Sequence, residues 1–220
     1  AAVTVAYNDR IYPGVKIWRA VSILDGAYLV IEILRSNKEH VYDRWFHGVP
    51  DQSNGLEGIP LDMKLRNDPL GSEGGYQTLT NLSSAVTGKN LNCDWIVPVS
   101  GKRKQFMLSM SVLNNTPLEV IHGFEWSHQF RTREKEFLLL SRKAKNADFI
   151  VLYEPHSGTS RLTKSERFTV TNEKGSTMDA AVGVNITLGK TSYEIILNPT
   201  GETVQAAGGL TNKVFSIVKK

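Results

Sequence analysis

The stretch VKIWRAVSILDGAYLVIEIL (residues 15–34) decides the fold class of this 220-residue chain. Two runs rich in β-branched and apolar residues, 15–24 and 27–34, flank the dipeptide Asp25-Gly26. Asp-Gly tolerates the positive φ angles that a two-residue type I′ turn requires, and this turn matches the twist of paired strands. The stretch therefore predicts an antiparallel β-hairpin.

A two-residue loop also fixes the register of this hairpin. If Leu24 faces Ala27, then Trp18 lies opposite Ile33 and Arg19 lies opposite Glu32. The ion pair predicted between Arg19 and Glu32 would be structural, and such pairs contribute at most ~1 kcal/mol.

The same period of two continues along the chain, and hardly any segment shows the period of 3.6 that marks a helix. The clearest case is 104–112, where apolar and polar residues alternate. The only plausible helical piece is short, near 81–86. The pattern predicts strands at 15–24, 27–34, 40–47, 76–81, 94–99, 104–112, 118–126, 136–142, 147–153, 167–173, 178–186, 191–197 and 213–218. About a dozen short strands broken by turn residues indicate an all-β, two-sheet antiparallel sandwich.

Composition limits the classes of partner. The chain has 40% hydrophobic and 22% charged residues, a net charge of +4 and one cysteine, Cys93. The mild basic excess favours an anionic partner. No apolar run approaches the ~20 residues of a membrane helix, and no basic segment matches a nucleic-acid motif, so we expect neither a membrane nor a nucleic-acid partner.

Two loops interrupt the predicted strands. Residues 48–75 are rich in Gly and Pro, and a loop of this length in a compact domain usually binds a ligand or packs on the surface. Residues 155–164 form a shorter polar loop, in which His156 is predicted to be solvated. No linker or repeat divides the chain, so residues 1–220 are predicted to form a single domain.

The segment HVYDRWFH (40–47) is the richest in functional side chains. On a strand, Asp43, Trp45 and His47 share one face, while His40, Tyr42, Arg44 and Phe46 share the other. Asp43 and His47 could bind a metal together or act as an acid–base pair. Alternatively, they satisfy each other or backbone groups at the strand end.

A second cluster lies in HGFEWSH (122–128), where His122, Phe124, Trp126 and His128 share one face. Trp126 and Trp45 could stack on sugar rings, which present apolar faces to aromatic side chains. The alternative is that both tryptophans fill the core of the sandwich.

Several strings taken together resemble the β-sandwich region of heparinase II/III-like polysaccharide lyases, including the oligo-alginate lyase relatives. The resemblance covers most of residues 7–155. Its landmarks are YPGVKIWRA (12–20), LDGAYLV (24–30), HVYDRWFH (40–47), GGYQTL (74–79) and DFIVLYEP (148–155).

The resemblance implies a function. Members of that family join an N-terminal (α/α) toroid to β-sandwich domains and cleave uronate-containing polysaccharides by β-elimination. It implies an acidic polysaccharide as the partner, with Tyr42, Arg44, Trp45 and Trp126 as substrate-binding residues. Because this chain shows no helical repeats, the catalytic residues of the toroid are expected to lie elsewhere, and we expect the C-terminal part of a lyase that is inactive alone. The family also implies a periplasmic or extracellular location.

Some relatives hold a metal in the sandwich through two His and one Asp, and His47 matches one of these positions, so zinc is the candidate cofactor. The second His would have to precede residue 1, while Asp25 and Asp43 compete for the Asp position. Two alternatives to a lyase domain stay open, namely a non-catalytic carbohydrate-binding module and a structural sandwich that binds a protein.

Overall fold

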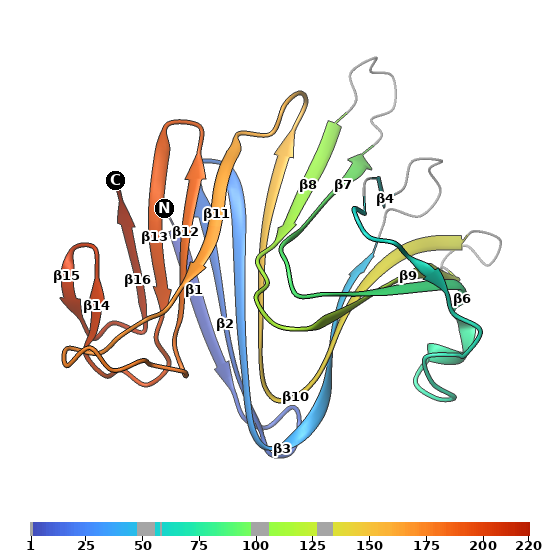
Figure 1. Ribbon diagram of the computed structural model, residues 1–220, viewed down its shortest axis with the longest axis horizontal. Coiled ribbons are helices and arrows are strands. Elements are labelled where there is room, and N and C mark those ends of the chain that lie inside the picture. Colours follow the sequence, from blue (N-terminus) through green and yellow to red (C-terminus); the bar gives the residue numbers. More distant parts are fainter. Residues whose placement is uncertain (1, 48–55, 58, 98–105, 127–133) are drawn as a thin grey trace. The chain divides into compact units, whose positions relative to one another are not determined.

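A computed structural model of the chain describes residues 2–47, 56–57, 59–97, 106–126 and 134–220. These residues form strands and a single short 3-10 helix, which confirms the all-β sandwich prediction (Figure 1). The strands are β1 (Ala2–Asn8), β2 (Val15–Leu24), β3 (Ala27–His47), β4 (Leu56–Glu57), β5 (Lys64–Leu65), β6 (Thr80–Thr87), β7 (Leu91–Val97), β8 (Phe106–Val112), β9 (Leu118–Trp126), β10 (Glu134–His156), β11 (Leu162–Phe168), β12 (Val182–Leu188), β13 (Thr191–Leu197), β14 (Val204–Ala206), β15 (Gly209–Thr211) and β16 (Phe215–Lys219). The 3-10 helix, η1, is Tyr76–Thr78.

The hairpin of β2 and β3 has the predicted register. Leu24 pairs with Ala27, Trp18 with Ile33 and Arg19 with Glu32. Asp25 and Gly26 have φ angles of 46° and 87°, as a type I′ turn requires. The ion pair between Arg19 and Glu32 is present, although Glu32 is buried while the Arg19 side chain is half exposed.

The chain divides into two compact units. Unit 1 comprises Ala1–Glu39, Lys145–Glu154 and Thr159–Lys220, and unit 2 comprises His40–Ala144 and Pro155–Gly158. The long strands β3 and β10 each contribute residues to both units. The prediction of a single domain stays a prediction.

Among the described residues, unit 1 contains the small two-stranded sheet of β14 and β15 and two larger sheets. In one, β1, β2, β3 and the unit 1 part of β10 lie in that order, and in the other β11, β12, β13 and β16 lie side by side (Figure 1). Inward residues such as Leu29, Ile31 and Ile33 on β3 and Val184 and Ile186 on β12 are fully buried. On β12 the buried residues alternate with the partly buried Asn185 and Thr187, and on β3 with the exposed Tyr28 and the partly buried Val30, so one face of each strand packs into the core.

One carboxylate ties the two sheets of unit 1 together. Asp148 on β10 accepts a hydrogen bond from Arg35 on β3 at 2.7 Å and another from Arg167 on β11 at 2.9 Å. All three side chains are largely buried, so the pairing compensates charges that would otherwise be costly to bury.

Unit 2 is built on β9, which pairs with β10 on one side and with β6 on the other. The short strand β5 extends β6, while β7 pairs with both β4 and β8. A cluster of buried side chains forms its core against β3, and its members are Leu82, Ile121, Phe137 and Leu139.

Several predicted boundaries were wrong. The segments 27–34 and 40–47 form one 21-residue strand, and 136–142 and 147–153 form one 23-residue strand. The polar residues between them signalled a loop, but none is Gly or Pro, so the pairing of strands continues through them. β1 was missed, and it lies at the edge of the sheet with its first six residues exposed.

The region around residue 80 was also predicted wrongly. The strand expected at 76–81 begins as the 3-10 helix, and the helical piece expected near 81–86 is strand β6. Asn81 has a φ of 52° within an irregularity of the ladder between Thr80 and Ser83. This bulge disturbs the period of two that marks a strand.

The first of the two predicted loops, 48–75, lies partly outside the described residues, whereas the second, 155–164, is described throughout. Within the 48–75 loop, the described part carries β4 and β5. The 155–164 loop is shorter than predicted, because β10 continues to His156 and β11 begins at Leu162. Among the described residues, no helix has the length and apolar character to span a membrane.

Candidate functional site

The C-terminal half of β3 places its side chains on two faces, as predicted. On one face, the rings of Trp45 and His47 stack in parallel, with centroids 5.7 Å apart and planes 6° apart. On the other face, the rings of His40 and Tyr42 lie 5.7 Å apart, and the Arg44 guanidinium lies 5.5 Å from the centre of the Phe46 ring. The first face, together with Tyr76, Glu125 and Lys135, is called the Trp45 face below.

Asp43 anchors the 3-10 helix to this face. The Tyr76 hydroxyl donates a hydrogen bond to Asp43 Oδ2 at 2.6 Å, and the Ser141 hydroxyl on β10 donates one to Asp43 Oδ1 at 2.6 Å. Both carboxylate oxygens are therefore engaged by neutral donors. Asp43 thereby positions Tyr76, whose ring lies 5.7 Å from that of Trp45.

His47 pairs with a carboxylate from another strand rather than with Asp43. Its Nδ1 lies 2.8 Å from Oε1 of Glu125 on β9, and the same oxygen lies 3.3 Å from Nζ of Lys135 on β10. The carboxylate fixes the orientation of the imidazole, as in metal sites where a second residue orients the ligand. This arrangement leaves Nε2 as the ring nitrogen that could bind a ligand, and 39% of the His47 side chain is exposed.

Trp45 is partly buried and belongs to both the face and the core. Its ring lies 5.0 Å from that of Phe137, and it packs against the cluster of Leu82, Ile121 and Leu139. Trp45 thus packs against the core and also lies beside His47 and Tyr76, so it combines both roles that the sequence suggested for it.

The other predicted binding residues lie elsewhere. Tyr42 is only 6% exposed, and Arg44 is half buried on the same opposite face of β3. Trp126 is the last residue of β9 and pairs with Glu134; its side chain lies outside the described residues. The structure thus brings Trp45 and His47 together and separates them from Tyr42 and Arg44.

Sequence reasoning missed Glu125 and Lys135, because their proximity to His47 depends on which strands pair. Glu125 and Lys135 face each other across β9 and β10 although they are ten positions apart in the sequence. A second pair of the same kind links His122 Nε2 to Glu136 Oε1 at 2.6 Å. Glu136 also accepts a hydrogen bond from the Leu56 backbone N–H at 2.6 Å and so holds β4 in unit 2.

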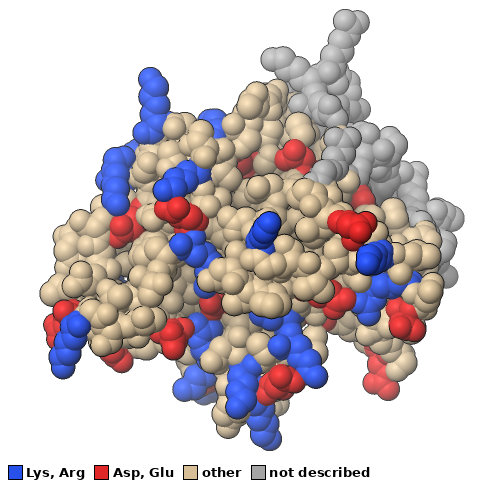
Figure 2. Space-filling model, viewed as in Figure 1, with Lys and Arg blue, Asp and Glu red and all other residues tan. Residues whose placement is uncertain are grey.

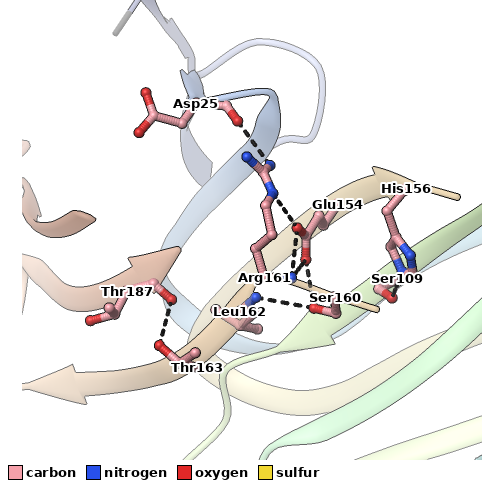
Figure 3. A network of polar contacts seen from close by, with 9 residues as sticks. All are labelled: Asp25, Ser109, Glu154, His156, Ser160, Arg161, Leu162, Thr163 and Thr187. Carbon is pink, nitrogen blue, oxygen red and sulfur yellow. Dashed lines mark hydrogen bonds and ion pairs between the residues drawn. The ribbon is translucent and has the colours of Figure 1, made fainter. Parts of the chain in front are cut away.

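His156 is not a solvated loop residue, which corrects the prediction. Its Nε2 lies 2.7 Å from the Ser109 hydroxyl (Figure 3). The Ser109 hydroxyl in turn lies 2.5 Å from Asp94 Oδ1. Among the described residues, His156 Nδ1 is buried and has no hydrogen-bond partner. A bare acceptor at Nδ1 costs less than an unpaired N–H, so Nε2 carries the proton and donates to Ser109. Ser109 then donates to Asp94, which is a structural chain and not an activated nucleophile.

Unit 1 holds a buried carboxylate, Glu154, near the end of β10 and before the turn to β11 (Figure 3). Glu154 accepts hydrogen bonds from the Ser160 hydroxyl at 2.6 Å and from Arg161 Nε at 2.9 Å. The Arg161 backbone N–H also donates to it, at 3.0 Å, and Arg161 Nη2 donates to the Asp25 carbonyl at 2.8 Å. Burial favours protonation, but these bonds from Ser160 and Arg161 outweigh it and lower the pKa of Glu154 below its usual value.

The two aspartates that compete for a metal position both have other partners. Asp25, in unit 1, has a lowered pKa because the Tyr193 hydroxyl donates a hydrogen bond to it, with smaller contributions from Lys219 and Thr191. Asp43 is engaged by Tyr76 and Ser141. Within the part of the chain that the structure describes, no three His, Cys, Asp or Glu residues could hold a metal ion together. His47 could therefore supply one ligand of a zinc site but not a complete one.

Charge is not gathered into a single patch on the visible face of the molecule. Figure 2 shows Lys and Arg side chains interleaved with Asp and Glu side chains. The net charge of +4 thus leaves a mild and distributed attraction for anions, and specific binding would need individual groups such as His47 and Lys135.

Comparisons with known proteins give a distant likeness in fold. No protein-family model matches the chain, and no curated protein matches it. Crystal structures of the heparan sulfate lyase HepC from Pedobacter heparinus and of a mutant of this lyase both match the chain, at 13% identity.

 The mutant structure covers 86% of this chain with a TM-score of 0.51, and the second structure covers 85% with a TM-score of 0.50.

This chain spans about a quarter of the length of those lyase chains, 25% and 24%. At 13% identity the likeness concerns the fold alone. The described strands thus form a β-sandwich whose fold is similar to part of a heparan sulfate lyase.

Proposed function

We propose that this chain is a β-sandwich domain of a polysaccharide lyase of the heparinase II/III-like kind. Its substrate would be a uronate-containing acidic polysaccharide, and its natural partner in the parent protein would be an (α/α) toroid. A periplasmic or extracellular location goes with this proposal. The observation that carries it is the match in fold to a heparan sulfate lyase over most of this chain.

The Trp45 face supports the proposal through the groups that it offers. β-Elimination requires a group that neutralises the uronate carboxylate, a base that removes the C5 proton and an acid that protonates the leaving oxygen. His47 and Lys135 can attract or hydrogen-bond a carboxylate, and the Trp45 and Tyr76 rings offer apolar surface to a sugar. Glu125 already contacts both His47 and Lys135, so it holds them in place.

The same face lacks a complete acid–base set among the described residues. Asp43 accepts hydrogen bonds from the hydroxyl groups of Ser141 and Tyr76, so the Tyr76 hydroxyl is already engaged as a donor. We therefore assign binding and orientation to this domain and expect the catalytic base and acid in the toroid. Tyr42, Arg44 and Trp126 remain proposed substrate-binding residues, although the burial of Tyr42 leaves it little surface to offer.

Zinc fits this proposal only in part. His47 would hold the ion through Nε2, with Glu125 orienting the ring from Nδ1, and the remaining ligands would come from outside the described residues. Bound zinc would supply structural order or a positive charge near the sugar carboxylate.

An elimination assay tests whether this domain binds the polysaccharide without cleaving it. The chain is mixed with heparan sulfate, alginate and other acidic polysaccharides, with and without zinc, and the ultraviolet absorbance of unsaturated uronates is followed. We expect no new absorbance from the chain alone, while the same samples show binding by affinity electrophoresis. Elimination by the chain alone would contradict the absence of catalytic groups, and absence of binding to every acidic polysaccharide would contradict the lyase-domain proposal itself.

A further inference from the structure

Two aromatic rings lie together on the exposed edge of unit 1, whereas the Trp45 face belongs to unit 2. Tyr7 on β1 pairs with Trp18 on β2, and their ring centroids lie 5.0 Å apart with planes tilted by 36°. Tyr7 is 50% exposed, and Trp18 is partly exposed. An aromatic pair of this kind at the surface presents apolar ring area that no described residue covers fully.

The Tyr7 ring is held in place by the loop that follows β1. Its hydroxyl donates a hydrogen bond to Asp9 Oδ2 at 3.0 Å. Asn8 Oδ1 in turn accepts hydrogen bonds from the backbone N–H groups of Arg10 at 2.8 Å and Ile11 at 2.9 Å, which fixes the start of the loop. A ring that is ordered before binding loses less conformational entropy when a ligand stacks on it.

Polar groups surround the ring pair on the same edge. Asp9 and Arg10 are exposed, and the Asp9 carboxylate keeps lone pairs beyond the one that Tyr7 uses. β1 is also the edge strand of its sheet, so alternate backbone N–H and C=O groups point away from β2. The edge therefore combines stacking surface with donors and acceptors suited to hydroxyl groups.

We propose that Tyr7 and Trp18, with Asp9 and the edge of β1, form a second sugar-binding surface that stacks on a pyranose ring. Pyranose rings match this surface because they carry an apolar C–H face and a rim of hydroxyl groups. The proposal takes its ligand class, an oligosaccharide, from the proposed function, but it uses none of the residues of the Trp45 face. In a lyase, such a surface would hold a stretch of the polymer that is not being cleaved.

Fluorescence and calorimetric titrations with a heparan sulfate oligosaccharide and a neutral cellulose-derived oligosaccharide test this surface. Stacking depends on the ring face and not on charge, so both sugars should bind and quench Trp fluorescence. We expect Tyr7→Ala to weaken both affinities about tenfold, which corresponds to about 1.4 kcal/mol. Tyr7→Phe keeps the ring and should lose less than Tyr7→Ala.

Tyr28→Ala is the matched control, because Tyr28 is also an exposed tyrosine of unit 1, at 44%. It should leave both affinities unchanged. Equal affinities for wild type, Tyr7→Ala and Trp18→Ala, with unchanged melting temperatures, would overturn the proposal. So would a concentration-dependent dimer that Tyr7→Ala abolishes while sugar binding persists, since the edge would then bind a second copy of the chain.

The outcome separates this proposal from the proposed function. Loss of the preference for acidic sugar in His47→Ala, with no effect of Tyr7→Ala, would overturn the second surface alone. Loss of neutral and acidic binding in Tyr7→Ala, with no preference for acidic sugar in wild type, would support the second surface and contradict the role proposed for the Trp45 face.

Discussion

Individual side chains contribute unequally to the stability of this protein, and Glu154 contributes strongly in unit 1. It is 1% exposed and accepts hydrogen bonds from Ser160 and Arg161, so it fixes the turn between β10 and β11. Nothing in the sequence distinguished Glu154 from the other acidic residues. Its role arises from burial, which depends on how β10 and β11 meet, whereas the Arg19–Glu32 pair followed from hairpin register alone.

We predict that Glu154→Gln lowers the free energy of unfolding by about 2 kcal/mol at neutral pH, because a charge-assisted hydrogen-bond network is lost. The lowered pKa of Glu154 means that the folded state holds the carboxylate charged where the unfolded state begins to protonate. The stabilisation is therefore complete above the usual carboxyl pKa of about 4.3 and is lost as the pH falls through the lower folded value.

Melting temperatures of wild type and Glu154→Gln, measured from neutral pH down to about pH 3, check this prediction. The difference in melting temperature between wild type and Glu154→Gln should decrease as the pH falls. Glu166→Gln is the control, since Glu166 is an exposed partner of Lys164 and should change stability little. A gap that stays constant across the pH range would contradict the assigned role of the Glu154 charge.

Substitution of His47 tests the binding role proposed for the Trp45 face. We predict that His47→Ala costs at most ~1 kcal/mol of stability, because its pair with Glu125 is partly exposed. Affinity for an acidic oligosaccharide should fall roughly fivefold, or about 1 kcal/mol, through loss of one hydrogen-bonding group. His40→Ala, on the opposite face of β3, serves as the control for calorimetric titration. Unchanged affinity in His47→Ala would remove His47 from the binding surface.

At the scale of elements, close packing around two glycines holds strands together. A Cβ at Gly123 on β9 would lie 2.6 Å from Leu82 Cδ2 and 3.0 Å from both Phe137 Cζ and the Thr80 carbonyl oxygen. A Cβ at Gly183 on β12 would lie 2.6 Å from the Phe168 ring. Both glycines sit within strands, where the residue is otherwise unfavourable, so close approach explains their presence.

We predict that Gly123→Ala lowers the free energy of unfolding by about 1–3 kcal/mol, because the added methyl group overpacks the core of unit 2. Urea denaturation measures the change. Gly88→Ala is the matched control in the same unit: a Cβ there meets nothing within 4 Å, and the φ angle is not positive. A loss in Gly88→Ala as large as that in Gly123→Ala would show that the cause is not overpacking.

Sequence patterns predicted the bounds of some strands but not of others. The β2–β3 hairpin, β9 and β13 were predictable to the residue, because turn chemistry and period-two alternation are local signals. The unbroken length of β3 and β10 was not, since their middle residues are polar and only the neighbouring strands keep them extended. β1 gave no alternation signal because an edge strand with exposed residues on both faces has no single buried face.

At the scale of the molecule, the face that unites His47, Glu125 and Lys135 depends on the order of strands. Sequence alone placed Trp45 and His47 on one face of a strand, which the structure confirms. It paired Asp43 with His47, whereas the structure gives Asp43 to Tyr76 and Ser141. Pairings between residues distant in sequence follow from sheet topology, and local patterns do not encode them.

Calorimetric titration would show whether this domain binds a uronate-containing polysaccharide, as we propose. The chain is titrated with an acidic uronate oligosaccharide and with a neutral one of equal length, at low and at high salt. We expect tighter binding of the acidic sugar at low salt and loss of that difference in affinity at high salt, since salt screens exposed charges. Equal affinity for the two sugars at low salt, or no binding of either, would contradict it.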